Sequence, residues 1–195
     1  GFVDETIFFE LISDCNFPSS DMIRLSTRFN KKYLGKNIKN ILSYTPEPDI
    51  FHEIFGHIPF LTDRNYCRFF KEIGDVALQI MNSSEISTDL KSHNIKRLQN
   101  FVWWTLEFGV INNYGNKNYR ILGAGILSSK DEINNLAECF NGKSNSKLLD
   151  YDIERVSLTT FDYSNIQDRY FCIKSFDELI KSFHDNKDIF FFGAK

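Results

Sequence analysis

Two of the four histidines in this sequence, His52 and His57, lie five positions apart in the segment HEIFGH. Imidazoles are common metal ligands, but in a regular α-helix residues five apart point about 140° away from each other. Both can reach one ion only where the helix ends or is distorted, and Gly56 beside Pro59 gives a reason for such a distortion. Two histidines and one carboxylate with open positions form the facial triad of non-haem Fe(II) oxygenases. The pattern therefore predicts an iron site that still needs its carboxylate.

The best candidate for the carboxylate is Glu107, which lies in the most apolar and aromatic run of the chain, FVWWTLEFG at residues 101–109. A buried carboxylate needs a partner, and a divalent cation is a suitable one. Glu53 is the rival ligand, although its place between the histidines is more natural for a group that faces a cofactor. Two other interpretations stay open on spacing alone. His52 and Glu53 could lie on an exposed polar face, and Glu107 could pair with an arginine inside an aromatic core.

The elements that must position these residues can be placed from capping residues and periodicity. Asp49 predicts the start of a helix that carries the histidines, and Asp63 the start of a helix with an apolar stripe. Ser129 and Ser175 each precede a glutamate by three residues, which is the capping-box pattern. We further expect a long helix at residues 90–112 and short strands at 119–125, 157–161 and 169–173. The sequence thus predicts a mainly α-helical fold with a few short β-strands.

Composition excludes several classes of protein. A chain of 195 residues fits one domain, and 42% hydrophobic residues are enough to build a core. The 23 basic and 26 acidic side chains are scattered, so we expect no nucleic-acid partner. The apolar runs fall short of the roughly 20 residues of a membrane span, so we expect no membrane partner. Four distant cysteines without a C-x-x-C pair, and an acidic N-terminus unlike a signal peptide, predict a cytoplasmic protein.

Three separated blocks resemble the pterin-dependent aromatic amino acid hydroxylases. They are YTPEPDIFHEIFGHIPFLTD at residues 44–63, WWTLEFG at 103–109, and GAGILSS at 123–129 followed by Glu132. A weaker fourth block lies at 169–176, and the first 24 residues resemble the bacterial members. The resemblance covers nearly the full chain. It implies the fold of that family's catalytic domain, as a single domain over residues 1–195 that is cut close at its N-terminal edge.

The resemblance also implies a role for each matching residue. His52, His57 and Glu107 would bind Fe(II) and form the catalytic centre. A tetrahydropterin would lie beside the metal, in contact with Val3, Phe8 and Glu53. The substrate, a free aromatic amino acid, would have its carboxylate on Arg24, which Glu132 would orient, with Thr45 and Ser128 nearby. Its ring would lie among Pro48, His52, Trp103, Phe108 and Gly125. The implied reaction is ring hydroxylation with O2. Trp103 favours phenylalanine or tyrosine over tryptophan as the substrate, and the conversion of phenylalanine to tyrosine is the leading case.

Departures from the family keep two other functions open. Val102 and Leu122 stand where the family usually carries tyrosine. The absent hydroxyl at Val102 and the short N-terminus favour an iron-dependent oxygenase that acts on an aromatic amino acid-like substrate without a free pterin. A non-catalytic binding domain on the same scaffold is the third possibility. A zinc hydrolase fits less well, because its H-E-x-x-H pattern needs a four-residue histidine step.

Overall fold

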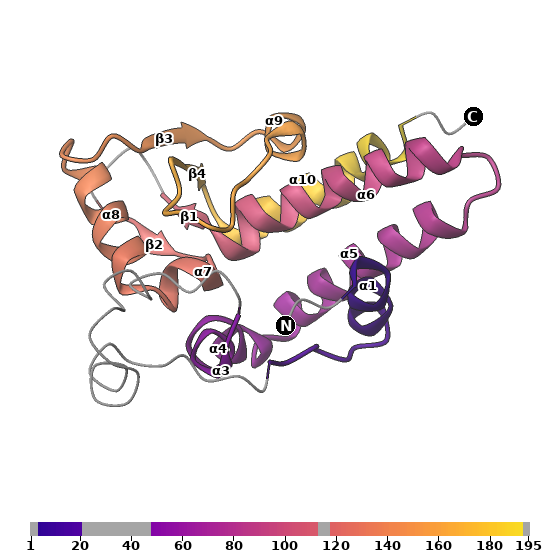
Figure 1. Cartoon of the computed structure of the whole chain (residues 1–195), viewed down its shortest axis with the longest axis horizontal. Helices are drawn as coiled ribbons and strands as arrows, with labels where there is room; N and C mark the ends of the chain where they lie inside the picture. The colour runs from indigo at the N-terminus through magenta and orange to yellow at the C-terminus, as the bar shows by residue number, and fades with distance from the viewer. Residues whose placement is uncertain (1–3, 21–47, 113–117, 193–195) are drawn as a thin grey trace, which may run out of the picture.

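The structure, a computed structural model, describes residues 4–20, 48–112 and 118–192. Within these ranges the chain is mainly helical with one small sheet, which confirms the predicted fold class. Figure 1 shows helices that run along the long axis and other helices that gather with the sheet at one end. Those along the long axis are α5 (Arg64–Asn82), α6 (Thr88–Val102) and α10 (Phe176–Asn186), and those beside the sheet are α7 (Ala124–Leu127) and α8 (Lys130–Phe140).

The capping residues start the helices where the sequence predicts. α3 (Ile50–His52) begins after Asp49, whose carboxylate accepts a backbone N–H of the helix. Asp63 does the same for α5. The hydroxyls of Ser129 and Ser175 accept the N–H three residues later, at the starts of α8 and α10. A side-chain oxygen at the first position satisfies a backbone donor that has no partner within the helix, so these four starts are set locally.

The sheet joins segments that are far apart in the sequence. Its strands are β1 (Gly109–Ile111), β2 (Arg120–Ile121), β3 (Lys147–Asp150) and β4 (Arg169–Ile173), in the order β2-β1-β4-β3. β1 pairs antiparallel with β2 and parallel with β4, and β3 also pairs parallel with β4. The predicted strand at 169–173 is confirmed as β4, whereas the strand predicted at 119–125 is reduced to the two residues of β2.

One predicted element is wrong, and another is correct only in its first part. No strand forms at residues 157–161: the first two belong to the helix α9 (Ile153–Leu158), and the other three have no regular structure. α9 is capped by Asp152, whose carboxylate accepts the N–H of Arg155 at 2.8 Å. The helix predicted at 90–112 stops being α-helical after Val102 and then gives way to β1. The parallel hydrogen bonds of β4 hold β1, and this distant partner could not be seen in the local apolar pattern.

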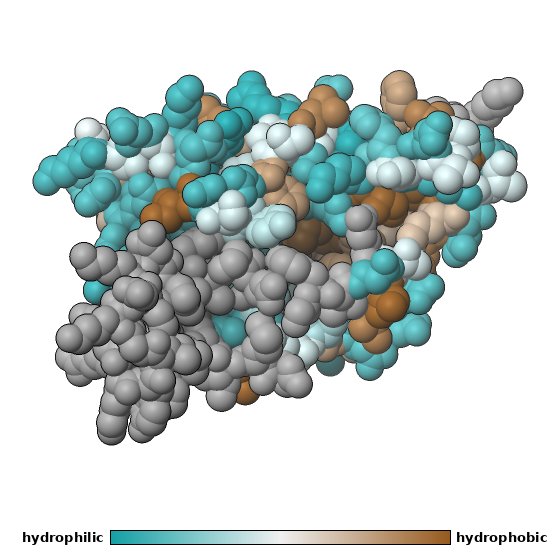
Figure 2. All heavy atoms as spheres, in the orientation of Figure 1, coloured by the Kyte–Doolittle hydropathy of each residue, from teal (hydrophilic) through white to brown (hydrophobic). Residues whose placement is uncertain are grey.

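A cluster of phenylalanine rings holds α5, α6 and α10 together. Phe183 on α10 lies 5.1 Å from Phe101 on α6 and 5.4 Å from Phe69 on α5, measured between ring centroids. Phe190 in the short helix η3 (Lys187–Phe191) closes the cluster at 5.6 Å from Phe183. On the face shown in Figure 2, apolar atoms lie in a recess between the upper and lower elements, beneath a mostly hydrophilic upper edge. Among the described helices, none combines the length and apolar character that crossing a bilayer requires.

The first helix, α1 (Glu5–Ser13), packs against α5 at a glycine. A Cβ on Gly74 would lie 2.6 Å from the backbone nitrogen of Ser13 and 3.0 Å from the carbonyl oxygen of Phe9. The Ser13 hydroxyl donates to Asp75 on α5 at 2.5 Å, and Phe9 and Ile12 are almost fully buried. The absence of a side chain at Gly74 therefore lets α1 bury its apolar face against α5.

We expect Gly74→Ala to destabilise the protein. The added methyl meets backbone atoms that cannot rotate away, and such overpacking costs about 1–3 kcal/mol. Alanine has a better helix propensity than glycine, which stabilises the helix by about 1 kcal/mol at most. The free energy of unfolding should therefore decrease. Urea denaturation should show it, while Gln79→Ala at an exposed site of the same helix should change the unfolding free energy by less than about 0.5 kcal/mol. A Gly74→Ala protein of undiminished stability would contradict the close packing of α1 on α5.

Candidate metal centre

A π-helical turn brings the two histidines together. This turn, η1 (Glu53–His57), lies between α3 and α4 (Ile58–Leu61). The N–H of Ile58 bonds to the carbonyl oxygen of Glu53, and this i→i+5 bond places one more residue in the turn than an α-helix holds. Residues five apart therefore return to the same face, and the Nε2 atoms of His52 and His57 lie 2.9 Å apart. The predicted distortion is a widened turn, and the helix continues beyond it.

A second π-helical turn delivers the carboxylate. The turn η2 (Trp103–Glu107) continues α6, and the N–H of Phe108 bonds to the carbonyl oxygen of Trp103 at 2.8 Å, again an i→i+5 bond. The Thr105 hydroxyl donates to the carbonyl oxygen of Phe101 at 2.6 Å. This carbonyl therefore has a hydrogen-bond partner where the α-helical turns of α6 give way to the π-helical turn. Glu107 is the last residue of this turn, so its position depends on how the phenylalanine cluster packs α6.

The three predicted ligands converge on one point. Glu107 lies 3.2 Å from Nε2 of His57 and 3.5 Å from Nε2 of His52, and the three ligand atoms lie within 4.8 Å of one another. Ligands that are about 2.1 Å from one ion and at right angles to each other lie about 3.0 Å apart. The separations of 2.9 to 3.5 Å are close to that spacing. The arrangement therefore fits an ion held on one side by two imidazoles and a carboxylate.

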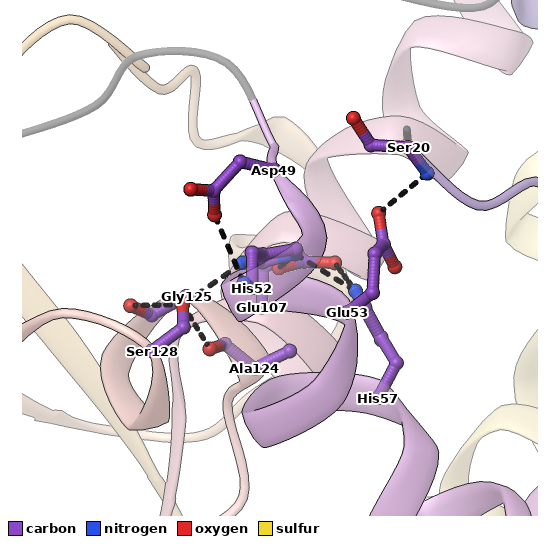
Figure 3. Close-up of polar contacts among 9 residues, drawn as sticks. All are labelled: Ser20, Asp49, His52, Glu53, His57, Glu107, Ala124, Gly125 and Ser128. Atoms are coloured by element: carbon purple, nitrogen blue, oxygen red, sulfur yellow. Dashed lines mark hydrogen bonds and ion pairs between the residues drawn. The ribbon is translucent and has the colours of Figure 1, made fainter. Parts of the chain in front are cut away.

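Helix α7 orients two of these side chains, as Figure 3 shows. The Ser128 hydroxyl lies 2.9 Å from Nδ1 of His52 and donates to the carbonyl oxygen of Ala124 at 2.9 Å. Because the hydroxyl proton goes to Ala124, Nδ1 of His52 carries the proton that Ser128 accepts, and Nε2 keeps its lone pair. The backbone N–H of Gly125 donates to the Glu107 carboxylate. Both contacts would hold the predicted ligand atoms in place for an ion.

Electrostatics keep the Glu107 carboxylate ionised. Burial alone would raise its pKa, but the neighbouring imidazoles and the hydrogen bonds from His57 and Gly125 prevail and lower the pKa to about 2. Burial likewise works against the charged form of His57, yet Glu107 and Glu53 together raise the pKa of that imidazole. The centre thus combines a fixed negative charge with nitrogen donors, which is the donor set that a divalent first-row metal takes.

We expect Ser128→Ala to weaken metal binding without unfolding the protein. The substitution removes the acceptor of the His52 Nδ1 proton, and loss of such an outer partner typically costs a factor of about 10–100 in metal affinity. Anaerobic titration with Co(II) or Fe(II), followed by calorimetry, measures the change. Ser92→Ala, at an exposed position of α6, should bind metal as the wild type does. Unchanged affinity in Ser128→Ala would rule out an orienting role for this hydroxyl.

Of the predicted pterin residues, Glu53 lies on the side of the histidines away from Ser128 (Figure 3). The Glu53 side chain is buried, and its Oε1 accepts the backbone N–H of Ser20 at 3.3 Å. Burial raises the pKa of this carboxyl, and Oε2 has no hydrogen-bond partner among the residues that the structure describes. Phe8 is half-buried on α1 and meets Phe70 edge-on. Phe17, which the sequence did not single out as a site residue, lies 4.9 Å from the His57 ring.

A wall of aromatic side chains lies beside the predicted metal ligands. Trp103 stacks on Phe108 at 4.8 Å and on Phe161 at 4.1 Å between ring centroids. Phe108 is buried and lies against Gly125, where a Cβ would be 2.5 Å from Cζ of its ring. The structure therefore brings the predicted residues Trp103, Phe108 and Gly125 together. Phe161 joins them from a segment that sequence reasoning placed in a strand, and nothing in its local pattern indicated this contact.

The remaining predicted residues fall in three groups. Pro48 directly precedes the Asp49 cap, at the start of the segment that carries His52 and His57. Glu132 is fully buried, and its carboxylate accepts the backbone N–H of Gln167 at 2.9 Å and the hydroxyl of Tyr170 at 2.5 Å. Sequence reasoning missed both of these partners. Three predicted residues lie outside the described ranges, namely Val3, Arg24 and Thr45.

The comparison with known protein families agrees with this geometry. A family profile described as biopterin-dependent aromatic amino acid hydroxylase matches residues 29–188. The chain belongs to this family. Among the curated hydroxylases, the phenylalanine-4-hydroxylase of Caulobacter vibrioides is 30% identical over 179 residues, which is 92% of this chain and 51% of that protein. The human phenylalanine-4-hydroxylase is 33% identical over 135 residues, 69% of this chain and 26% of that protein. The chain thus spans about half the length of its bacterial relative.

Solved structures of the family show the same fold. Phenylalanine hydroxylase from Legionella pneumophila superposes with a TM-score of 0.74 at 28% identity, covering 97% of this chain and 69% of that one. The cobalt-bound phenylalanine hydroxylase of Chromobacterium violaceum gives a TM-score of 0.72 at 27% identity, covering 93% of this chain and 56% of that one. The helices and the small sheet described above are therefore the hydroxylase catalytic fold.

Proposed function

We propose that this chain is the core of a metal-dependent monooxygenase that hydroxylates the ring of a free aromatic amino acid, with L-phenylalanine converted to tyrosine. The observation that carries the proposal is the convergence of His52, His57 and Glu107 beside the wall formed by Trp103 and Phe108. Family membership and the relatives named phenylalanine-4-hydroxylase support the same reaction. The small-molecule partners of the proposal are the amino acid and O2.

The donor set favours Fe(II) as the metal. Two imidazoles and one carboxylate on one side of an ion leave positions open on the other side, the arrangement that non-haem Fe(II) oxygenases use. Zinc has no redox chemistry, so it could not serve a reaction with O2. The relative whose structure is bound to cobalt supports a first-row divalent ion in this fold. In this proposal the ionised Glu107 supplies the negative charge, and Ser128 and Gly125 hold two of the ligands in place.

A tetrahydropterin is the proposed reductant. The unpaired Oε2 of the buried Glu53 fits an N–H donor of such a ring, and the family description supports a biopterin. When bound, Fe(II) would provide the centre for O2 and the pterin the two electrons that reduce its second oxygen atom. The protein's own part is to hold the substrate ring against Trp103 and Phe108 and to exclude water from that wall. We also infer a cytoplasmic location, which the four free cysteines support.

Turnover with purified components tests the proposed function. The chain is loaded with Fe(II) under anaerobic conditions and then given L-phenylalanine, a tetrahydropterin and ¹⁸O2. We expect tyrosine that carries one ¹⁸O atom, and no product when metal, pterin or O2 is left out. Comparison with L-tryptophan tests the preference that Trp103 predicts.

Two outcomes would favour the other functions. Product formed equally well without pterin, with another reductant present, would indicate the pterin-independent oxygenase, for which Val102 is the motivating residue. A protein that binds no metal and forms no product with any aromatic amino acid would indicate the non-catalytic binding domain.

A further inference from the structure

Gln167 makes six hydrogen bonds at the back of the aromatic wall, two of which its backbone carbonyl accepts from Asn135 and Ser146. Its side-chain oxygen Oε1 accepts the indole N–H of Trp103 at 3.1 Å, and its backbone N–H donates to Glu132 at 2.9 Å. Its side-chain nitrogen Nε2 donates to the carbonyl oxygens of Asp162 and Asn165, at 2.9 and 2.8 Å. The residue is 3% exposed. A buried amide with all its groups engaged is held in one orientation.

The two carbonyl oxygens decide which way the amide faces. They accept hydrogen bonds only, so the NH₂ group of Gln167 must point toward Asp162 and Asn165. The amide oxygen is therefore left facing the indole N–H of Trp103. This orientation is fixed by the loop at residues 162–165 and does not depend on Trp103 itself. Gln167 thus presents a preformed acceptor to the tryptophan.

Stacking alone does not fix the position of the Trp103 ring. Parallel aromatic rings hold one another face to face at 4.1 and 4.8 Å, but such contacts tolerate sliding and rotation in the plane of the ring. A hydrogen bond at the edge of the indole removes that freedom because it requires a donor and an acceptor in line. The bond from Nε1 to Gln167 therefore sets which edge of Trp103 faces the site.

We propose that Gln167 is a positioning residue that sets the orientation of Trp103 and, through its backbone N–H, the placement of Glu132. Trp103 is in the wall assigned to the substrate ring, and Glu132 is assigned to the opposite, carboxylate end of the substrate. Gln167 is 3% exposed and contacts both residues, so it fixes the positions of the two ends of the site relative to each other. The part of this inference that concerns substrate rests on the proposed function, whereas the orientation of Trp103 does not.

The indole N–H signals test the orientation directly. The chain has two tryptophans, so a ¹⁵N-labelled sample gives two indole N–H resonances, and Trp103→Phe assigns them. Gln167→Leu, which is similar in size and keeps the backbone N–H, should shift the Trp103 resonance. The resonance of Trp104, which donates to the carbonyl oxygen of Thr159 at 2.8 Å, should stay in place. The matched control Gln79→Leu, at an exposed site on α5, should move neither.

Kinetics with a double-mutant cycle test the effect on substrate. Loss of one hydrogen bond that orients the wall should raise KM for L-phenylalanine about tenfold in Gln167→Leu, with a smaller change in kcat. In the Trp103→Phe background the indole donor is already gone, so Gln167→Leu should raise KM by less than about twofold. The leucine also removes the bonds to Asp162 and Asn165, but their loss would act equally in both backgrounds.

The outcomes separate this inference from the proposed function. An unmoved Trp103 resonance in Gln167→Leu would overturn the orienting bond. A moved resonance with the same KM increase in both backgrounds would overturn the role in substrate positioning and leave a structural one. If the wild-type chain turns over no aromatic amino acid, the proposed function fails. The resonance of Trp103 still decides in that case whether Gln167 orients it.

Discussion

Glu107→Gln is expected to abolish tight metal binding and, with it, any O2-dependent turnover. Glutamine has the same shape, so the fold and the contacts to α7 should persist, but it lacks the negative charge that balances a divalent ion. The ionised state of Glu107, whose pKa is lowered to about 2, makes this charge present throughout the neutral range. Loss of an anionic ligand should reduce affinity by more than the factor of about 10–100 that outer partners contribute. Anaerobic calorimetry with Fe(II) or Co(II) measures it.

Thermal stability gives a second readout that needs no activity. A ligand that binds only the folded state stabilises it by about 2.7 kcal/mol at 100 times its dissociation constant. The wild type and Glu138→Gln, an exposed control on α8, should therefore gain melting temperature when metal is added. Glu107→Gln should gain none. The metal-free proteins provide the baseline for each comparison.

A metal-dependent rise in the melting temperature of Glu107→Gln would remove Glu107 from the ligand set. Glu53 would then be the candidate, because it is buried beside the same histidines and its Oε2 has no partner among the described residues. Glu53→Gln tests that alternative in the same assay. If Glu53 is a metal ligand, Glu53→Gln should abolish metal binding. If Glu53 contacts the pterin instead, the substitution should leave metal affinity nearly unchanged.

The parts of the fold that the sequence predicts are those that depend on near neighbours. Asp49, Asp63, Ser129 and Ser175 each mark a helix start, because a cap needs only a side-chain oxygen and a backbone N–H two or three residues away. The strand at 169–173 is also recognisable, as a short run of apolar and aromatic residues. These signals lie within a few residues of the feature that they predict.

The parts that depend on distant partners could not be predicted in this way. β1 looks like the end of a helix until its parallel pairing with β4 is known, and that strand lies about sixty residues later. Glu132 was assigned to Arg24 by resemblance, while its described partners are Gln167 and Tyr170. The five-residue histidine step predicted a distortion but not its kind. A π-helical turn differs from an α-helical one by a single hydrogen-bond shift, which the residue types do not encode.

Gly56 has a role that the structure redefines. It was expected to help the helix end or become distorted between the histidines, and the distortion is the π-helical turn η1, after which the helix continues into α4. A Cβ at Gly56 would lie 2.8 Å from Cβ of Ala124 and 2.9 Å from its carbonyl oxygen. The glycine therefore lets η1 approach α7. That approach bears on the proposed metal site, because α7 carries the Gly125 N–H that donates to Glu107 and is followed by Ser128, the partner of His52.

Gly56→Ala should consequently weaken both the fold and the metal site. The methyl meets the backbone of α7, so η1 and α7 must separate, at a cost of about 1–3 kcal/mol in unfolding free energy. The same separation pulls Ser128 from His52, and metal affinity should fall at least tenfold. Gly142→Ala is the matched control, because its Cβ would meet nothing within 4 Å and only its φ of +68° opposes the change. That control should lose about 1 kcal/mol of stability but bind metal normally. If calorimetry gives Gly56→Ala the metal affinity of the control, the close packing of η1 on α7 does not set the ligand geometry.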